Sequence, residues 1–344
     1  MRKAGLLILI STLTILNLKS FASQKVVKAI RIDENIQLDG RLEEAAWEKT
    51  TYATGFIQRN PAPGKKSSYK AKVGVLYDDA AIYFGAKIEI GDQDKIVRQL
   101  TLRDNVDDAD YFSIFIDTYN NGQNAFEFTV TTSNVQKDVM HTPVSRSVNW
   151  NAAWRSEISY EGKYWFIEVE IPYSALRFSS APEQVWGLNF RRTVRLENEV
   201  DYWNEIDPEV NGFVNQFGTL YGLKDIDPPL RLQFSPYISA YIDQFNDGSS
   251  QYSSSLNYGM DLKYGLTDAF TLDMMLIPDF GQVQSDNRVL NLSAFEVQFN
   301  ENRQFFLEGT EIFNKGGFLY SRRIGGRPLL FGEADDDLNV NEEV

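Results

Sequence analysis

Hydrophobic and polar residues alternate with a period of two along most of the chain, a pattern that predicts β-strands. The alternation is clearest in residues 164–192, where every second residue from 165 to 171 is large and apolar. Pro172 cannot donate a hydrogen bond to a neighbouring strand, so we expect the first strand to end there. The alternation resumes at 186–190 after a short connection. Two half-buried strands joined in this way are typical of a β-sandwich.

The same pattern extends over residues 26–226. Turn sequences such as Asn121-Gly122 separate further alternating segments at 71–77, 82–88, 112–116, 126–130 and 154–160. One short helix is expected at 43–47, with Trp47 as its buried anchor. Short strands at regular spacing, without a long helical period, predict an all-β fold, an antiparallel β-sandwich.

Pro228-Pro229 marks a boundary, because consecutive prolines stop both strands and helices. The alternating segments beyond it, at 232–242, 256–265 and 270–276, are longer. Apolar residues on one face, polar or small residues on the other and aromatic residues near the strand ends are typical of an outer-membrane β-barrel. A soluble protein whose extra strands pack on the sandwich would produce similar alternation and is the alternative.

Residues 229–330 are too few for a closed barrel. Even a small barrel needs about eight strands of roughly ten residues plus turns, whereas 115 residues follow Pro229. An open sheet edge is not viable in lipid. We therefore expect long antiparallel strands of an incomplete β-barrel, as the front part of a longer protein or a truncated product. The acidic residues 331–344 are expected to be a disordered tail.

The N-terminus has the three parts of a secretory signal peptide in order. Arg2 and Lys3 are basic, residues 6–18 are apolar, and residues 20–22 supply a cleavage site with small residues. The apolar run is too short for a membrane-spanning helix. We expect residues 1–22 to be removed after Ala22. The mature protein is then exported, to the outer membrane, the periplasm or the cell surface.

The composition excludes several functions. A net charge of −14 argues against a nucleic-acid partner, because phosphate binding needs a basic surface. The absence of cysteine excludes disulfides, thiolate nucleophiles and cysteine–zinc sites. His141 is the only histidine, so a multi-histidine metal site is impossible and a Ser-His-Asp triad would have to use it.

A cluster of carboxylates precedes the predicted strand at 112–116. Oxygen ligands of this kind suit a hard cation such as Ca²⁺. The spacing matches no EF-hand loop, and a solvated acidic loop is the alternative. Ca²⁺ is therefore the one candidate cofactor, with Asp107, Asp108 and Asp110 as its candidate ligands.

Aromatic residues supply candidates for carbohydrate binding, because flat rings stack on the apolar faces of sugars. Trp150 lies in an irregular polar stretch, and Trp203 follows Tyr202 near the end of the sandwich. Core packing is the alternative, and we expect it for Trp154. Arg103 completes the candidate carbohydrate-binding set of Trp150, Trp203, Tyr202 and Arg103.

Glu168 and Glu170 lie two residues apart and therefore share one strand face. A pair of carboxylates could serve as the acid and base of glycoside hydrolysis. We prefer the alternative that both glutamates lie on the exposed face of an edge strand. No catalytic residue is therefore predicted.

Several stretches resemble two known families. Residues 36–47, IQLDGRLEEAAW, are similar to the opening signature of carbohydrate-binding module family 9, a DOMON-like domain. Residues 111–138 resemble the middle of its envelope branch, and residues 164–192 its closing strands. Four later stretches resemble an uncharacterised outer-membrane barrel domain, DUF5916-like, that usually follows a family 9 module: residues 278–283, 291–296, 302–309 and 320–325. Asn134 replaces a common glycine, and Gln304 a frequent proline.

The resemblance implies a function. Family 9 members clamp a terminal sugar between two tryptophans, here assigned to Trp150 and Trp203, and some bind calcium. The leading hypothesis is an exported, envelope-associated, non-catalytic protein that binds a polysaccharide or oligosaccharide and is anchored in outer-membrane lipid by its C-terminal strands. One alternative is a glycoside hydrolase or a hydrolase-associated module in carbohydrate catabolism. Another is a structural periplasmic plug or gate of a barrel.

Overall fold

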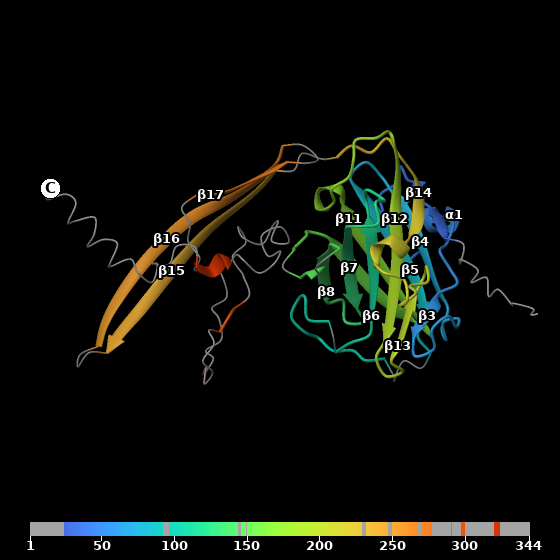
Figure 1. Ribbon diagram of the computed structural model, residues 1–344, viewed down its shortest axis with the longest axis horizontal. Helices are drawn as coiled ribbons and strands as arrows, with labels where there is room; N and C mark the ends of the chain where they lie inside the picture. The colour runs from blue at the N-terminus through green and yellow to red at the C-terminus, as the bar shows by residue number, and fades with distance from the viewer. Residues whose placement is uncertain are drawn as a thin grey trace, which may run out of the picture.

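The computed structural model describes residues 24–91, 96–106, 108–143, 146–148, 150–228, 232–246, 250–266, 270–276, 290, 297–299 and 320–323. These residues form a two-layered β-sandwich and a separate three-stranded sheet (Figure 1). The predicted signal peptide, the acidic tail, Asp107 and most of the C-terminal signature stretches lie outside the described residues.

The larger layer of the sandwich is a nine-stranded sheet in the described part of the chain, with the order β1-β14-β12-β6-β7-β8-β9. Strand β13 also pairs with β12, and β3 pairs with β13. All pairs are antiparallel except that of β1 and β14. The strands are β1 (Val26–Lys28), β3 (Ile57–Asn60), β6 (Tyr111–Asp117), β7 (Ala125–Thr131), β8 (Gln136–His141), β9 (Arg146–Ser147), β12 (Glu183–Val194), β13 (Glu199–Tyr202) and β14 (Gly218–Lys224).

The smaller layer is a five-stranded sheet with the order β10-β11-β5-β4-β2. Its strands are β2 (Ile30–Arg31), β4 (Ala71–Tyr77), β5 (Ala81–Glu89), β10 (Arg155–Glu161) and β11 (Tyr164–Pro172). Only β2 pairs in parallel, with β4. The prediction of an all-β sandwich is therefore confirmed, with two short parallel strands added to a mainly antiparallel architecture.

Helical structure is confined to short turns in the described residues. These are α1 (Ala45–Lys49) and the 3₁₀ turns η2 (Tyr173–Ala175), η3 (Val214–Gln216) and η6 (Ser321–Arg323). Helix α1 overlaps the short helix that the sequence predicts, and turn η2 lies in the short connection that follows Pro172. No helix in this part of the chain has the length and hydropathy needed to cross a membrane.

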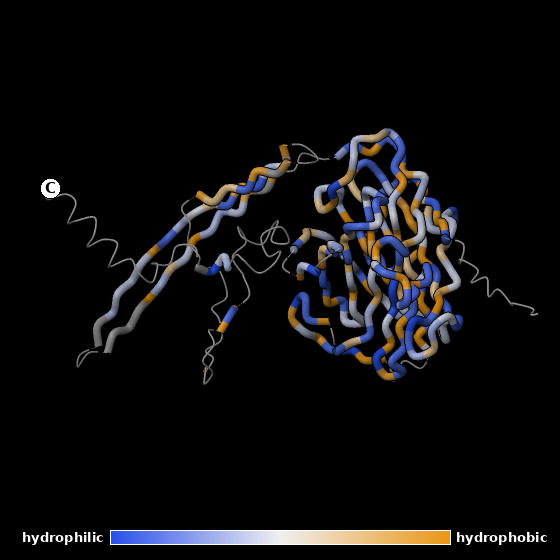
Figure 2. Tube along the Cα trace, viewed as in Figure 1, coloured by the Kyte–Doolittle hydropathy of each residue, from blue (hydrophilic) through white to orange (hydrophobic). Residues whose placement is uncertain are grey.

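The apolar faces of the two layers pack together as the alternation predicts. Trp165 and Ile171 from β11 and Trp186 from β12 are at most 1% exposed. Phe190 of β12 packs edge-on against Phe84, with ring centroids 6.0 Å apart. Hydrophobic and hydrophilic positions alternate along the strands of both layers (Figure 2). Burial of this apolar surface is the main contribution to the stability of the sandwich.

Asn134 shows why this chain can replace a glycine in the turn before β8. Its φ angle is 57°, in the left-handed region that asparagine enters more readily than most residues. Its side chain also donates to the carbonyl of Ser156 across a distance of 3.0 Å. The substitution is therefore compatible with the backbone of the loop.

Glu168 is buried, so the expectation that it lies on an exposed edge strand is wrong. Strand β11 lies between β10 and β5, and the segment before α1 covers its polar face. Glu168 Oε2 accepts hydrogen bonds from the backbone N–H groups of Asp39 (3.0 Å) and Gly40 (2.8 Å). Its Oε1 accepts one from Trp47 Nε1 at 3.2 Å. Burial raises the pKa of Glu168 to about 7, although the two backbone N–H groups oppose that rise.

The covering segment fits closely onto the sheet. A Cβ at Gly40, whose φ angle is 77°, would lie 2.5 Å from the backbone of Ile158. A Cβ at Gly85 would lie 2.7 Å from the ring of Trp47, so this glycine leaves the space that the indole fills. The segment before α1 therefore closes the outer face of the smaller sheet, with Glu168 as its hydrogen-bonding partner.

The third sheet contains β15 (Leu232–Asn246), β16 (Ser250–Gly265) and β17 (Thr271–Leu276), which pair antiparallel and form a long curved ribbon (Figure 1). The register aligns Phe234 with Leu262 and Leu262 with Met274. It thereby gathers the apolar positions of all three strands on one face, where Phe234 and Ile238 are 54% and 73% exposed. The prediction of long antiparallel strands is confirmed, and one face of their sheet is apolar and open.

Substituting Glu168 tests its role in fastening the covering segment. Glu168→Ala leaves the backbone N–H groups of Asp39 and Gly40 and the indole N–H of Trp47 without this acceptor, so we expect the free energy of unfolding to fall by about 2–4 kcal/mol. Glu157→Ala is the matched control, because Glu157 lies opposite Glu168 on β10 and is exposed. Denaturant unfolding of both variants measures the difference. Equal losses would show that Glu168 does not hold the segment.

Candidate functional site

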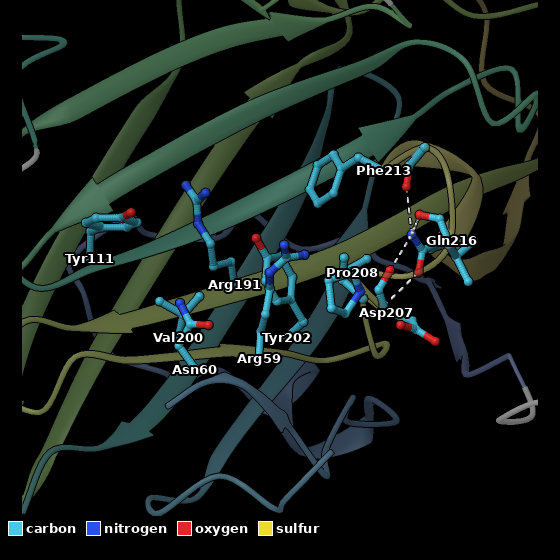
Figure 3. Close-up of a pocket in the computed structure, with 13 residues that line it drawn as sticks. Arg59, Asn60, Tyr111, Arg191, Val200, Tyr202, Asp207, Pro208, Phe213 and Gln216 are labelled. Atoms are coloured by element: carbon cyan, nitrogen blue, oxygen red, sulfur yellow. Dashed lines mark hydrogen bonds between the residues drawn. The ribbon is translucent and has the colours of Figure 1, made fainter. Parts of the chain in front are cut away.

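A cavity of about 520 Å³ opens on the outer face of the larger sheet (Figure 3). Strands β3, β6, β12 and β13 form its floor, and the loop before η3 forms one wall. Both charged and aromatic side chains line it. The lining residues are Arg59, Asn60, Tyr111, Arg191, Val200, Tyr202, Ile206, Asp207, Pro208, Val210, Gly212, Phe213 and Gln216.

Strand register explains why these side chains share one face. Arg191 of β12 lies opposite Tyr202 of β13 and Ser113 of β6, so all three point outward from the sandwich. The next residue, Arg192, lies opposite Asp201 and points to the other face. One strand therefore presents an arginine to the cavity and an arginine to the interior of the sandwich.

Arg191 is fixed in the floor of the cavity. Its Nη2 donates to Ser113 Oγ at 3.0 Å and to Glu127 Oε1 at 2.5 Å. Its guanidinium carbon lies 5.0 Å from the ring centroid of Tyr111 and 5.2 Å from that of Phe115, both within the range of a cation–π contact. Polar and aromatic contacts together hold this cation in one orientation.

Glu127 of β7 is the anion beneath the cavity, and its side chain is 1% exposed. Its Oε2 forms a 2.6 Å hydrogen bond with His141 Nε2 and accepts one from Arg146 Nη2 at 3.3 Å. Burial alone would raise the pKa of Glu127, but Arg191, His141 and Arg146 outweigh that effect and lower it. The carboxylate is therefore ionised. The one histidine of the chain takes part in this ion network.

Hydrogen bonds from the side chain of Gln216 hold together the loop at the far end of the cavity. Its Oε1 accepts a hydrogen bond from the backbone N–H of Asp207 at 2.8 Å, and its Nε2 donates to the carbonyl of Gly212 at 2.7 Å (Figure 3). Phe213 on the same loop packs edge-on against Phe115, with centroids 5.1 Å apart. The wall is thus tied both to itself and to the sheet.

Tyr202, a residue predicted to bind carbohydrate, does line the cavity. Burial raises the pKa of its hydroxyl, although Arg191 opposes the rise, so the hydroxyl remains a hydrogen-bond donor at neutral pH. Trp203 points the other way, is 2% exposed and packs against Phe190 with centroids 5.7 Å apart. The expectation that Trp203 is a surface residue is therefore corrected, since core packing covers its ring.

Trp150 and Arg103 lie away from the cavity lining. Trp150 is half-buried, and its ring centroid is 5.0 Å from that of Phe126. Arg103 donates to Gln136 Oε1 at 2.7 Å and forms an ion pair with Asp138, which fastens its loop to β8. The structure does not bring the four predicted carbohydrate-binding residues together. Sugar contacts by Trp150 and Arg103 stay predictions.

The predicted calcium ligands lie in different environments. Asp107 lies outside the described residues, and Asp108 is exposed. Asp110 is buried, and its carboxylate accepts hydrogen bonds from the backbone N–H groups of Arg195 (2.7 Å) and Val97 (3.3 Å). Burial raises the pKa of Asp110. The described part of the chain contains no group of three or more His, Cys, Asp or Glu side chains placed to hold a metal ion. Calcium binding stays a prediction.

Comparison with known protein families assigns the sandwich to a family. The family described as "Carbohydrate family 9 binding domain-like" matches residues 38–211, just over half of the chain, and the chain belongs to this family. A second family, "Domain of unknown function (DUF5916)", matches residues 228–344. Both resemblances seen in the sequence are thereby confirmed. No curated protein matches the chain.

Two solved structures with similar backbones are family 9 carbohydrate-binding modules (CBM9) from Caldicellulosiruptor kristjanssonii. One, in complex with cellotriose, has 15% identity and a TM-score of 0.42, with 58% of this chain and 96% of that chain covered. The other, in complex with glucose, has 15% identity and a TM-score of 0.43, with 60% of this chain and 100% of that chain covered.

Sequence reasoning missed Arg59, Glu127 and the cavity role of Arg191. The alternation of β12 does place Arg191 on the polar face, opposite the buried Phe190. Glu127, between Phe126 and Phe128, carried the stronger signal, because a glutamate inside an aromatic strand needs a cationic partner if it is buried. Its partners come from three other strands, so they could be identified only after the pairing of the strands was known.

Substituting Glu127 tests the ion network. Glu127→Gln leaves Arg191 buried without its anion, so we expect the free energy of unfolding at neutral pH to fall by about 3–5 kcal/mol. The pKa of Glu127 is lowered on folding, so its contribution is present above its usual pKa of 4.5 and is lost as the pH falls below that value. Denaturant unfolding at a series of pH values measures both effects.

The exposed Glu157 gives the control, Glu157→Gln. Between about pH 5 and pH 3, Glu127→Gln should lose less stability than the wild type, because the titrating group is gone. An unchanged acid profile together with wild-type stability at neutral pH would contradict the network.

Proposed function

We propose that this chain is a carbohydrate-binding protein and that the cavity containing Arg191 and Tyr202 is its binding site. The observation that carries the proposal is a fixed set of polar groups beside aromatic rings in a cavity of ligand size. Cavities that hold small ligands are typically about 300–1,000 Å³, and this one is about 520 Å³. Membership of the carbohydrate family 9 binding domain-like family supports the assignment.

The groups present match what a sugar ring requires. Sugar hydroxyls both donate and accept hydrogen bonds, and the cavity offers the donors Arg191 and Tyr202 and the acceptor Asp207. The ring of Phe213 supplies apolar surface that can contact the C–H face of a sugar. Because hydrogen bonds fix Arg191 and the Asp207–Gln216 loop before a ligand arrives, little ordering is needed on binding.

We propose binding without catalysis. The hydrolase alternative depends on the pair Glu168 and Glu170 as acid and base. Glu168 already accepts three hydrogen bonds beneath Trp47 and the segment before α1. Glu170 forms an ion pair with Arg155 on the adjacent strand. These contacts support structural roles for both carboxylates.

A panel of neutral and acidic oligosaccharides, including cellotriose, tests binding by calorimetry with the full chain. Tyr202→Phe keeps the ring and removes the hydroxyl, so affinity for a bound glycan should fall by about 2- to 10-fold, as expected for one neutral hydrogen bond. Tyr221→Phe is the control, since Tyr221 is exposed on β14, outside the cavity lining. Absence of binding to every glycan in the panel would rule out the proposal.

We further propose that the protein is exported and that the apolar face of β15, β16 and β17 contacts outer-membrane lipid. The supporting observation is the register that places Phe234, Leu262 and Met274 in one row. Phe234 and Ile238 on this apolar face are more than half exposed, and contact between such a face and water is unfavourable. A lipid environment removes this cost and is the setting in which such alternation is stable.

Neighbouring substitutions on β15 test the lipid contact. Ile238→Lys places a charge on the apolar face, which costs about 2–4 kcal/mol near the middle of a bilayer, so association with phospholipid vesicles should weaken at least tenfold. Ser239→Lys adds the same charge to the opposite face and should leave association nearly unchanged. Flotation of the full chain with vesicles measures both. Equal behaviour of the two variants would contradict a one-sided lipid contact.

A further inference from the structure

The cavity carries a positive charge that the protein as a whole does not. The chain has a net charge of −14, yet Arg59 and Arg191 line the cavity and Arg146 lies beside its floor. The carboxylate beneath the floor, Glu127, is shared by Arg191, Arg146 and His141. An excess of cations at this one place is unexpected in an acidic protein and points to an anionic ligand.

Arg59 is the cation without an anion. Residues of β3 alternate between the two faces, so the side chain of Gln58 points inward and donates to Glu199 Oε2 at 3.0 Å, whereas Arg59 lines the cavity. Arg59 forms no hydrogen bond or ion pair with any residue that the structure describes. Arg191 and Arg192, by contrast, both have carboxylate partners.

The carboxylate in the cavity lining does not neutralise Arg59. Asp207 belongs to the loop at the other end of the cavity, where its Oδ1 accepts the backbone N–H of Glu209 at 2.8 Å. Arg59 lies beside Tyr202 and Arg191 in the middle of the cavity (Figure 3). The cavity therefore has a cationic centre and a polar end closed by Gln216.

We propose that the ligand of this cavity is a saccharide bearing a carboxylate, a uronic acid residue, and that Arg59 binds that carboxylate. This inference rests on the proposed carbohydrate-binding function and specifies its substrate class. A guanidinium group matches a carboxylate with two parallel hydrogen bonds. Arg59 is only partly exposed, so a ligand without negative charge would cover this cation and leave it unpaired, which is unfavourable.

The neighbouring groups fit the rest of such a sugar. Phe213 in the cavity lining offers apolar ring surface beside the cationic centre, and the hydroxyl of Tyr202 is a protonated donor. Asp207 at the far end can accept hydrogen bonds from sugar hydroxyls. A neutral sugar satisfies these groups equally well, so the discrimination between acidic and neutral sugars falls on Arg59.

The test compares trigalacturonate with its fully methyl-esterified form, which keeps every ring and hydroxyl and removes the charges. Calorimetry on the full chain should show the acid binding at least tenfold more tightly than the ester, as expected for a hydrogen bond to a charged group. Affinity for the acid should fall with added salt, and affinity for the ester should not.

Arg59→Gln should abolish the preference for the acid, and affinity for the ester should stay the same or rise, because the ester then covers no unpaired cation. Arg155→Gln is the matched control, because it removes the same charge from an exposed position on the smaller sheet. Circular dichroism of both variants confirms that the fold is retained.

The outcomes separate this inference from the proposed function. Equal binding of acid and ester, or a preference that survives Arg59→Gln, overturns the assignment of a uronic acid while carbohydrate binding stands. Binding of other neutral glycans with no binding of trigalacturonate has the same meaning. Absence of binding to every saccharide tested overturns both.

Discussion

The buried ion pair between Glu127 and Arg191 is the interaction on which the candidate site depends. A carboxylate that is 1% exposed is tolerated only if cations and hydrogen-bond donors surround it, and here Arg191, His141 and Arg146 do so. These partners come from β12, β8 and β9, so the pair also joins strands across the larger sheet. The cavity floor is rigid because its central cation is already committed to this anion.

A second ion network lies on the inner side of the same strands. Arg192 donates to Glu199 Oε1 at 2.8 Å and to Asp201, and all three side chains are at most 3% exposed. Burial raises the pKa of Asp201 to about 6, and the neighbouring Glu199 adds to the rise, whereas Arg192 opposes it. The paired strands β12 and β13 thus bury charge on both faces. The interior network and the cavity both depend on the pairing register of these two strands. A shift of one residue would move the side chains of one strand to the opposite face of the sheet.

The sandwich and the third sheet differ in how far their apolar residues are shielded from solvent. In the sandwich, two apolar faces cover one another, and Trp165 and Trp186 are at most 1% exposed. In the third sheet, the described strands align their apolar positions on a face where Ile238 is 73% exposed. The first arrangement is complete in water. The second leaves apolar residues exposed, and our proposal that lipid covers them rests on strand length and alternation.

The sequence by itself determined the sandwich, the family and the strands with the clearest alternation, because alternation with a period of two is a local property. The alternation placed Arg191 on the face opposite Phe190, whereas Tyr202 and Trp203 were assigned to one binding set. Only the tertiary structure decided which face is covered. The segment before α1 buries Glu168, and packing against Phe190 removes Trp203 from the surface.

The same reason explains why the cavity could not be found from the sequence. Its residues come from β3, β6, β12, β13 and a loop, which are up to 157 positions apart between Arg59 and Gln216. Strand order and register bring them together, and these depend on contacts between distant segments. The sequence fixes what each residue can do chemically, whereas non-local pairing determines which residues meet.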